Sequence, residues 1–274
     1  MNSNRGVLYL LSGTSHAVRL VVSIASLRHV YDGPIAVVTT DDEAAKLAEQ
    51  MAADATLQII HRPIDVGRVR KRTEAYLLKT RLYEFSPFES TAYLDCDTLV
   101  RGSIDDLFEF PTPEHVIVTQ FTDWVTTGRI ISKRIRSWND THPDLVQPAL
   151  DFGPAINTGV FAFTRSSTVM TRWHEVASDG RSHFIPDELA MQLIIPHVPH
   201  VVLDGRFNCS GLYGNAAGTE TRIVHLHGNK HLRCKGGLWL EAFTRVCDRN
   251  LGNITQWAPA GDKRLRQHLA AVTS

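Results

Sequence analysis

Alternating strands and helices in the first hundred residues limit the folds open to this chain. Residues 7–11 are a continuous apolar run, as expected of a strand buried on both faces, and residues 35–39 form the next strand. Between them, Val18, Val21, Val22 and Ala25 fall on one helical face. Strands that alternate with helices favour a parallel sheet flanked by helices. We therefore expect an α/β, Rossmann-like doubly wound fold, whose ligands lie beyond the carboxyl ends of the strands.

The remaining elements of the expected fold follow from the same patterns. Thr40 and Glu43 form a capping-box pattern that predicts a helix start, and a helix is expected from Thr73 through Leu82 and Tyr83. Residues 121–150 are polar and fit neither the periodicity of a helix nor that of a strand. Further strands are predicted at 57–60, 91–94, 116–119, 157–163, 201–203 and 222–226, and further helices at 168–177, 186–195 and 239–249.

Composition excludes some classes of function. The 274 residues carry 29 basic and 29 acidic side chains, and this balance provides no field that would attract nucleic acid. No window reaches the roughly 18 consecutive apolar residues of a membrane-spanning helix, and the N-terminus lacks a signal-peptide pattern. The four cysteines form no CxxC pair. We expect a cytoplasmic protein with reduced thiols.

Two aspartates mark the strongest candidate site. Asp95 and Asp97 follow the apolar run of residues 91–94, and side chains two apart on a strand point the same way. Together they could hold one cation, and carboxylates suit magnesium or manganese. One alternative is a solvated strand end where an Asp caps a turn. Another is an aspartate-based phosphatase, which is disfavoured because that motif has Thr or Val four places after the first Asp, where this chain has Leu99.

Four sequence motifs, in order, point to a known family. Residues 78–110 combine a Lys-containing helix, an apolar strand, an Asp-x-Asp-Thr sequence and a final Ile-Asp-Asp-Leu-Phe. Three further motifs follow, at residues 156–161 (INTGVF), 186–190 (PDELA) and 224–230 (VHLHGNK). In this combination the chain resembles the family 8 retaining glycosyltransferases of the GT-A fold. That group contains glycogenin and the bacterial lipopolysaccharide galactosyl- and glucosyltransferases, and the resemblance covers most of residues 7–231.

The sequence departs from the family pattern at three places. Cys96 replaces the usual small residue between the aspartates, and Glu188 stands where several members have Gln. Only Asn229 lies between Gly228 and Lys230, one residue fewer than in the family, and no Pro-Trp follows. His231 therefore occupies the spacing of the family's diphosphate-binding lysine.

The resemblance implies a metal site and a donor site. It makes Asp95, Asp97 and His225 the ligands of Mn(II) or Mg(II), with His227 as an alternative ligand or phosphate contact. Without the family pattern, His225 would be taken as a satisfied histidine in an apolar strand. Lys79 would contact the donor, the alternative being a solvated helix charge. The implied donor-binding set is completed by Leu10, Ser12, Thr14, Asp95, Cys96, Asp97, Gly228, and Lys230 or His231.

The resemblance also implies catalytic residues. Asn157 and Asp187 would contact the sugar or the acceptor hydroxyl. Family members retain the anomeric configuration, by front-face displacement or through a covalent intermediate. In the second case Asp187 or Glu188 would be the nucleophile.

The expected function is therefore transfer of a hexose from a nucleotide-sugar, taken as a UDP-sugar, to a saccharide, lipid-linked or small-molecule acceptor. The alternative is a non-catalytic protein of the same fold that binds nucleotide-sugar. One catalytic domain is expected over residues 1–249, with nucleotide-sugar binding in about 1–110, acceptor binding in about 111–235 and a tail at 250–274. Basic residues of that tail would give at most peripheral membrane contact. The pattern carries no signal for the oligomeric state.

Overall fold

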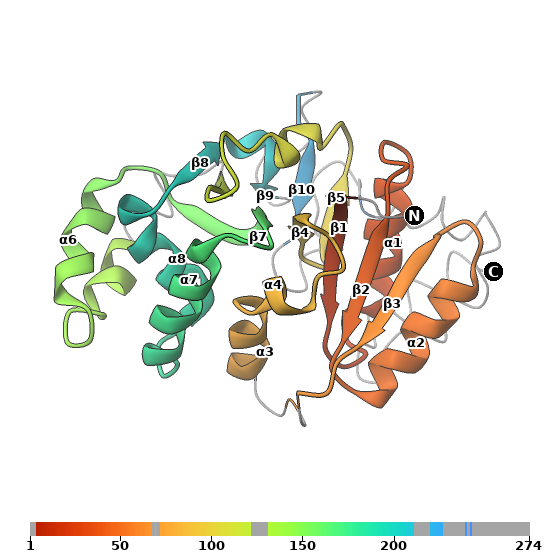
Figure 1. The fold of residues 1–274 in the computed structure, drawn as a ribbon, viewed down its shortest axis with the longest axis horizontal. Coiled ribbons are helices and arrows are strands. Elements are labelled where there is room, and N and C mark those ends of the chain that lie inside the picture. Colours follow the sequence, from red (N-terminus) through yellow and green to blue (C-terminus); the bar gives the residue numbers. More distant parts are fainter. Residues whose placement is uncertain are drawn as a thin grey trace. The chain divides into compact units, whose positions relative to one another are not determined.

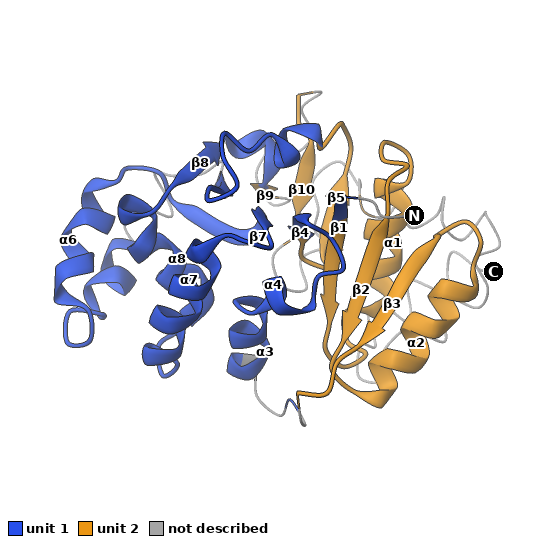
Figure 2. Ribbon diagram, in the orientation of Figure 1, with its two compact units in different colours: residues 1–6, 69–93, 105–208 blue, residues 7–68, 94–104, 209–274 orange. Residues whose placement is uncertain are grey.

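A computed structural model describes residues 4–66, 69, 72–121, 131–210, 220–226, 239 and 242 of the chain. The chain divides into two compact units (Figure 2). Unit 1 comprises residues 1–6, 69–93 and 105–208, and unit 2 comprises residues 7–68, 94–104 and 209–274. Each unit gathers segments that lie far apart in the sequence. The predicted single domain with a tail, and its division near residue 110, stay predictions.

Unit 2 begins with the expected alternation of strand and helix. Its strands β1 (Arg5–Leu11), β2 (Ile35–Thr39) and β3 (Ile59–Pro63) pair in parallel in the order β3-β2-β1, with Val7 opposite Ile35 and Ile35 opposite Ile59. Helices α1 (Ala17–Leu27) and α2 (Asp42–Ala53) accompany these strands (Figure 1). All eleven residues of α1 are buried. The predicted strands are confirmed, with two differences: β1 begins two residues earlier than expected, and β3 covers residues 59–63 instead of 57–60.

The start of α2 corrects the predicted capping box. Asp41, not Thr40, is the N-cap residue, and its Oδ1 accepts a hydrogen bond of 2.9 Å from Ala44 N. The Thr40 hydroxyl instead lies 3.0 Å from Ser12 Oγ. A carboxylate satisfies an orphan amide at a helix start well, so Asp41 is the better cap.

A second, three-stranded sheet of unit 2 was not predicted. It contains β5 (Thr98–Val100), β10 (Ile223–His225) and β9 (Cys209–Ser210), in the order β5-β10-β9. Strand β10 runs antiparallel to β5 and parallel to β9. With two or three residues each, β5 and β9 are too short to give a recognisable period.

Unit 1 contains the strand order β4-β7-β6-β8. Strand β6 pairs in parallel with β8 but antiparallel with β7, and the β6–β7 register shifts between Val118 and Thr119. Strands β1 and β2, β2 and β3, and β6 and β8 pair in parallel, so the sheet structure is mostly parallel as predicted. The four strands are β4 (Ser90–Leu94), β6 (Val116–Gln120), β7 (Ile156–Thr164) and β8 (His200–Leu203).

Helices account for much of the rest of unit 1. Residues 131–136, within the stretch that fitted neither period, are helical, as is α6 in the same stretch. The helices are α3 (Arg72–Lys79), α4 (Leu82–Phe85), α6 (Pro143–Asp151), α7 (Thr168–Asp179) and α8 (Pro186–Ile194), with 3₁₀ turns η1 (Asp105–Phe108), η2 (Ile195–His197) and η3 (Gly205–Phe207).

One predicted helix is two. The helix expected from Thr73 to Tyr83 breaks after Lys79, where Thr80 N and Arg81 N bond three residues back, to Leu77 O and Leu78 O. The Thr80 hydroxyl also donates to Leu77 O at 2.7 Å. These bonds take up the carbonyls that would have continued α3, so the chain starts again at α4.

Two further expectations can be compared with the described residues. Among them, no helix has both the length and the apolar character needed to cross a bilayer. Cys96 and Cys209 are buried free thiols, while the other two cysteines lie outside the described residues.

Candidate functional site

The two aspartates lie in a turn rather than on a strand. Strand β4 ends at Leu94 and β5 begins at Thr98, so Asp95 and Asp97 belong to the connection between them. The Asp95 carbonyl accepts hydrogen bonds from Thr98 N at 3.2 Å and from Thr98 Oγ1 at 2.9 Å. This closes a four-residue turn. The expected common direction of the two carboxylates is therefore produced by the turn, not by strand alternation.

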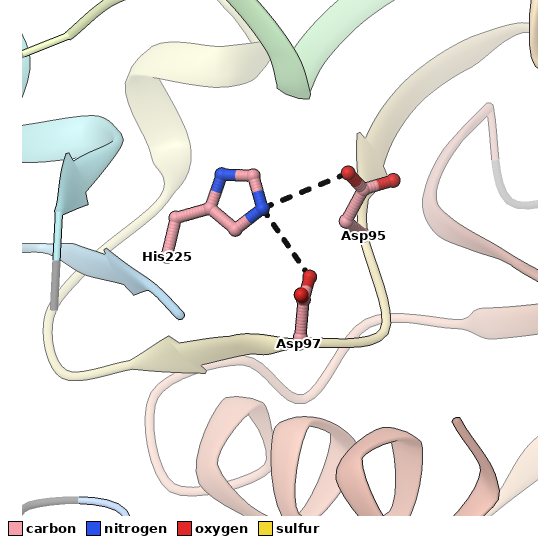
Figure 3. Close-up of side chains that lie close together, drawn as sticks. All are labelled: Asp95, Asp97 and His225. Carbon is pink, nitrogen blue, oxygen red and sulfur yellow. Dashed lines mark ion pairs between the residues drawn. The ribbon is translucent and has the colours of Figure 1, made fainter. Parts of the chain in front are cut away.

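Strand β10 brings a histidine to the same turn. Pairing with β5 places His225 opposite Thr98, and Leu226 N donates to Asp97 O at 2.9 Å. His225 Nε2 lies 3.2 Å from Asp97 Oδ1 and 3.7 Å from Asp95 Oδ2 (Figure 3). Asp97 and His225 are buried, and Asp95 is partly exposed. We call these three residues the acidic cluster.

The acidic cluster fits a divalent cation. Each residue offers one ligand atom, and these atoms all lie within 4.8 Å of one another. Ligands about 2.1 Å from an octahedral ion lie about 3 Å apart when they are neighbours, close to the separations seen here. Two carboxylates and an imidazole suit manganese as well as magnesium. In the described part of the chain, this is the one group of His, Cys, Asp and Glu side chains with such a geometry.

The carboxyl end of β1 forms an ordered loop beside β2. Asp41 Oδ2 accepts a hydrogen bond of 2.7 Å from Gly13 N, and Gly13 has a positive φ of 65°. Ser12 and Thr14, predicted to meet the nucleotide, flank this glycine. A glycine adopts this conformation without a Cβ clash, so the loop can turn sharply over the strand end. Asp41 was not among the predicted residues, although it directly follows the predicted strand and the polar pair 39–40.

Leu10 and Cys96, two of the predicted donor-binding residues, are in contact. The Cys96 thiol is buried and lies 3.2 Å from the Leu10 carbonyl oxygen, to which it donates. The structure thus joins two of the predicted donor-binding residues. The contact ties the turn that carries the aspartates to the end of β1.

A second polar cluster lies in unit 1. Lys79, at the end of α3, is buried, with Nζ 3.5 Å from Asp187 Oδ2 and 3.3 Å from the Thr158 carbonyl. Thr158 Oγ1 donates to the same Asp187 oxygen at 3.0 Å. The alternative of a solvated helix charge for Lys79 is therefore wrong. A buried lysine and a buried aspartate compensate each other's charge, which neither could carry alone at low cost.

Asn157 orients the second acid of this cluster. Asn157 Oδ1 accepts from Gly159 N at 3.0 Å. Because a backbone amide can only donate, the Asn157 amide nitrogen must face Glu188, whose Oε2 it approaches to 2.5 Å. Asn208 Nδ2 also donates to Asn157 Oδ1 at 3.0 Å, which fixes the amide from a third side.

Burial changes the acidity of Glu188. Loss of hydration raises its pKa to about 7, and the neighbouring Asp187 charge adds to this rise. The hydrogen bond from Asn157 and the charges of Lys79 and Arg134 act in the opposite direction. Near neutral pH, Glu188 is therefore divided between its protonated and ionised forms, which suits a group that exchanges protons.

Helix α8 positions both acids. Pro186 begins the helix, and the carboxylates of Asp187 and Glu188 lie in its first turn, where the helix dipole favours negative charge. Trp173 Nε1 donates to the Asp187 carbonyl at 2.7 Å. Gln192 Oε1 accepts from Ile156 N at 2.8 Å and so joins α8 to β7. Trp173 is thus a core residue.

The structure groups the predicted residues into two sets. Asp95, Cys96, Asp97 and His225 lie together in unit 2, and Lys79, Asn157, Asp187 and Glu188 lie together in unit 1. Thr158 and Asn208 were missed. Thr158 falls inside the motif at 156–161, whereas Asn208 follows a 3₁₀ turn and carries no sequence signal. Gly228, Lys230 and His231, together with His227, lie outside the described residues.

Comparison with known proteins identifies the fold. No protein-family model matches the sequence, and no curated protein matches it significantly. The galactosyltransferase LgtC, solved with donor and acceptor sugar analogs, is 14% identical at a TM-score of 0.64, covering 96% of this chain and 99% of LgtC. The bifunctional glycosyltransferase WbbM is 13% identical at a TM-score of 0.63, covering 99% of this chain but 52% of WbbM.

A third structure agrees. Mouse xyloside xylosyltransferase 1 is 14% identical at a TM-score of 0.56, covering 83% of this chain and 98% of its own. This chain thus spans about half of WbbM and nearly the whole of LgtC and the xylosyltransferase. The GT-A glycosyltransferase fold expected from the sequence motifs is confirmed.

Proposed function

We propose that this chain is a metal-dependent, retaining glycosyltransferase that transfers a hexose from a UDP-sugar. The observation that carries the proposal is the convergence of Asp95 and Asp97, from the turn between β4 and β5, with His225 of β10, with ligand atoms within 4.8 Å on a GT-A fold. All the similar structures named above are described as glycosyltransferases. A fold alone supports many functions, so the acidic cluster carries the argument.

The acidic cluster and the β1 loop are assigned to the donor. Bound Mn(II) or Mg(II) would offset the negative charge that develops on the leaving diphosphate. Asp95, Asp97 and His225 would hold the ion, and Asp95, the more exposed of the three, would lie nearest the phosphates. The polar loop at Ser12–Thr14 would contact the base and ribose. Lys230 or His231, with Gly228, would complete the diphosphate site.

The cluster in unit 1 is assigned to the sugar and the acceptor hydroxyl. Asp187 has its charge compensated by Lys79, whereas burial keeps Glu188 partly protonated at neutral pH. In a double displacement we therefore assign the nucleophile to Asp187 rather than to Glu188. Glu188, which accepts a hydrogen bond from Asn157, would then exchange a proton beside it. In a front-face displacement the same residues would orient the sugar.

The acceptor is proposed as a saccharide, a lipid-linked saccharide or a small molecule, with no nucleic-acid partner and at most peripheral membrane contact. LgtC was solved with both a donor and an acceptor sugar analog, which supports a saccharide. We keep the cytoplasmic setting expected from the sequence, and the buried free thiols of Cys96 and Cys209 agree with it.

The test is UDP release from a panel of UDP-hexoses with Mn(II), with and without a chelator. Slow hydrolysis of the donor would produce UDP without added acceptor, and simple glycosides added in a second series would speed transfer. Chelator-sensitive release from one sugar would identify the donor. UDP binding without release in either series would favour the non-catalytic alternative. Release that a chelator leaves unchanged would refute the metal-dependent mechanism.

A further inference from the structure

A row of buried hydroxyl groups runs from β1 through α1 to the turn of residues 95–98, which carries the two aspartates and is called the acidic turn below. The Tyr9 hydroxyl lies 2.9 Å from Ser23 Oγ, and Ser23 Oγ lies 2.8 Å from Thr98 Oγ1. Thr98 Oγ1 then donates to the Asp95 carbonyl at 2.9 Å. We call Tyr9, Ser23 and Thr98 the hydroxyl row. All three side chains are buried.

The direction of these hydrogen bonds follows from counting protons. Each hydroxyl has a single proton to donate. Thr98 gives its proton to the Asp95 carbonyl, so its oxygen accepts from Ser23. Ser23 has then used its proton, so it accepts from Tyr9. Burial raises the pKa of Tyr9, which keeps the phenol protonated and able to donate. Every donor therefore points toward the acidic turn.

The serine hydroxyls of helix α1 do not face solvent but form hydrogen bonds inside the protein. All of its residues are buried, and a buried hydroxyl is costly unless it is hydrogen-bonded. Ser26, one turn beyond Ser23, donates to the Ser23 carbonyl at 2.7 Å and accepts from Val100 N at 2.9 Å. Ser23 and Ser26, the two serines of α1, therefore each form a hydrogen bond with a residue of β5. An apolar residue at either place would remove a hydrogen bond between α1 and β5.

The acidic turn is short, so a small rotation would separate its ligands. Thr98 is the last residue of the turn and also pairs with His225 across the β5–β10 ladder. A shift of Thr98 would therefore change the positions of both Asp97 and His225. The hydroxyl row also holds Thr98 through its side chain, from a helix that contributes none of the three ligand residues.

We propose that Ser23, acting through Thr98, is a positioning residue that holds Asp95, Asp97 and His225 in the geometry that binds the metal ion. The inference rests on the proposed function, because it assumes that the acidic cluster binds a divalent cation. It adds a residue of α1 that no motif of the sequence marks. Outer hydrogen-bond partners of metal ligands commonly govern affinity in this way.

The experiment measures binding of Mn(II) alone, without nucleotide, by the loss of the free-ion signal in electron paramagnetic resonance. Ser23→Ala and Thr98→Val each remove one link. We expect about tenfold weaker Mn(II) binding for each, the lower end of the range for lost outer-shell partners. Thr98→Ser keeps the hydroxyl and is expected to retain the wild-type affinity. Tyr9→Phe removes only the outermost donor and is expected to have a smaller effect.

Ser86→Ala is the matched control. Ser86 Oγ forms a buried hydroxyl pair with Thr91 Oγ1 at 2.6 Å in unit 1, so its loss removes the same kind of bond from residues that belong to neither the hydroxyl row nor the acidic cluster. We expect similar destabilisation in thermal unfolding but unchanged Mn(II) affinity.

The outcomes separate this inference from the proposed function. Wild-type affinity in Ser23→Ala, whatever the result for Thr98→Val, would overturn the positioning role while leaving the metal site intact. Equal loss in Ser86→Ala would also overturn it, because the effect would then be general destabilisation. If the wild-type protein bound no Mn(II), the metal site itself would fail, and this inference with it.

Discussion

Replacing Glu188 by Gln tests the electrostatics of the buried cluster in unit 1. In the folded protein burial raises the Glu188 pKa from 4.5 to about 7. Between pH 4.5 and about pH 7, the folded state therefore keeps the Glu188 carboxyl protonated, whereas the unfolded state has released this proton. Stability is unaffected by Glu188 below pH 4.5, falls as the pH rises towards 7, and is lowest above 7, where the buried carboxylate is ionised. Gln carries no charge at any of these pH values, so the variant lacks this dependence.

The size of the effect follows from the shift. A difference of about 2.5 pKa units corresponds to about 3 kcal/mol of destabilisation at high pH, of which about 2 to 3 kcal/mol develops between pH 5 and pH 8. The gap in unfolding free energy between Glu188→Gln and wild type should grow by this amount over that range, in favour of the variant. The measured quantity is the change in this free-energy difference between pH 5 and pH 8. New contacts of the Gln amide alter the difference equally at both pH values and therefore do not affect this change.

The assay is urea unfolding followed by circular dichroism at pH 5, 6, 7 and 8. Glu84→Gln is the control, since its hydrogen bond from Arg81 lowers the Glu84 pKa and that carboxylate stays ionised throughout the range. This control should give a constant gap. Parallel curves for Glu188→Gln and wild type would refute the raised pKa, and with it the assignment of Glu188 as a proton-exchanging group.

Three further substitutions test separate parts of the account. Asp97→Asn should abolish chelator-sensitive UDP release while leaving the circular dichroism spectrum unchanged; surviving activity would mean that the metal assignment is wrong. Lys79→Met should cost about 3 to 5 kcal/mol in urea unfolding, because it leaves the Asp187 charge buried and uncompensated, and adding Asp187→Asn should restore part of that loss; no restoration would argue against the pairing. Asp41→Ala should lower stability by about 1 kcal/mol and weaken UDP binding, because Asp41 caps α2 and holds Gly13. Asp41→Asn should keep the cap. Unchanged UDP affinity in Asp41→Ala would mean that the β1 loop is not part of the donor site.

The sequence allowed the regular elements to be predicted wherever one period ran long enough. Strands β1 and β2 and helices α1, α7 and α8 were expected close to their observed bounds. The short strands β5 and β9 were not, because two or three residues carry no period. The break between α3 and α4 was missed because a threonine such as Thr80 is tolerated within a helix. Only its hydrogen bonds to the Leu77 carbonyl show the interruption.

The candidate site could be predicted residue by residue but not as an arrangement. The spacing of Asp95 and Asp97 suggested a shared cation, although the turn that aligns them depends on Thr98 and on β10. Nothing local indicates that Asn208 fixes Asn157 or that Ser23 lies against Thr98, because both contacts join segments distant in sequence. The burial of Lys79 was likewise invisible, as a lysine in an amphipathic helix ordinarily faces water.

Calorimetric titration of UDP, with and without Mn(II), tests most directly whether the acidic cluster binds the donor's diphosphate through a metal ion. We expect saturable binding of one UDP per chain with Mn(II), and at least tenfold weaker binding when a chelator replaces the metal or when Asp97 is changed to Asn. Equal UDP affinity under all three conditions, or no UDP binding with Mn(II) present, would contradict this expectation.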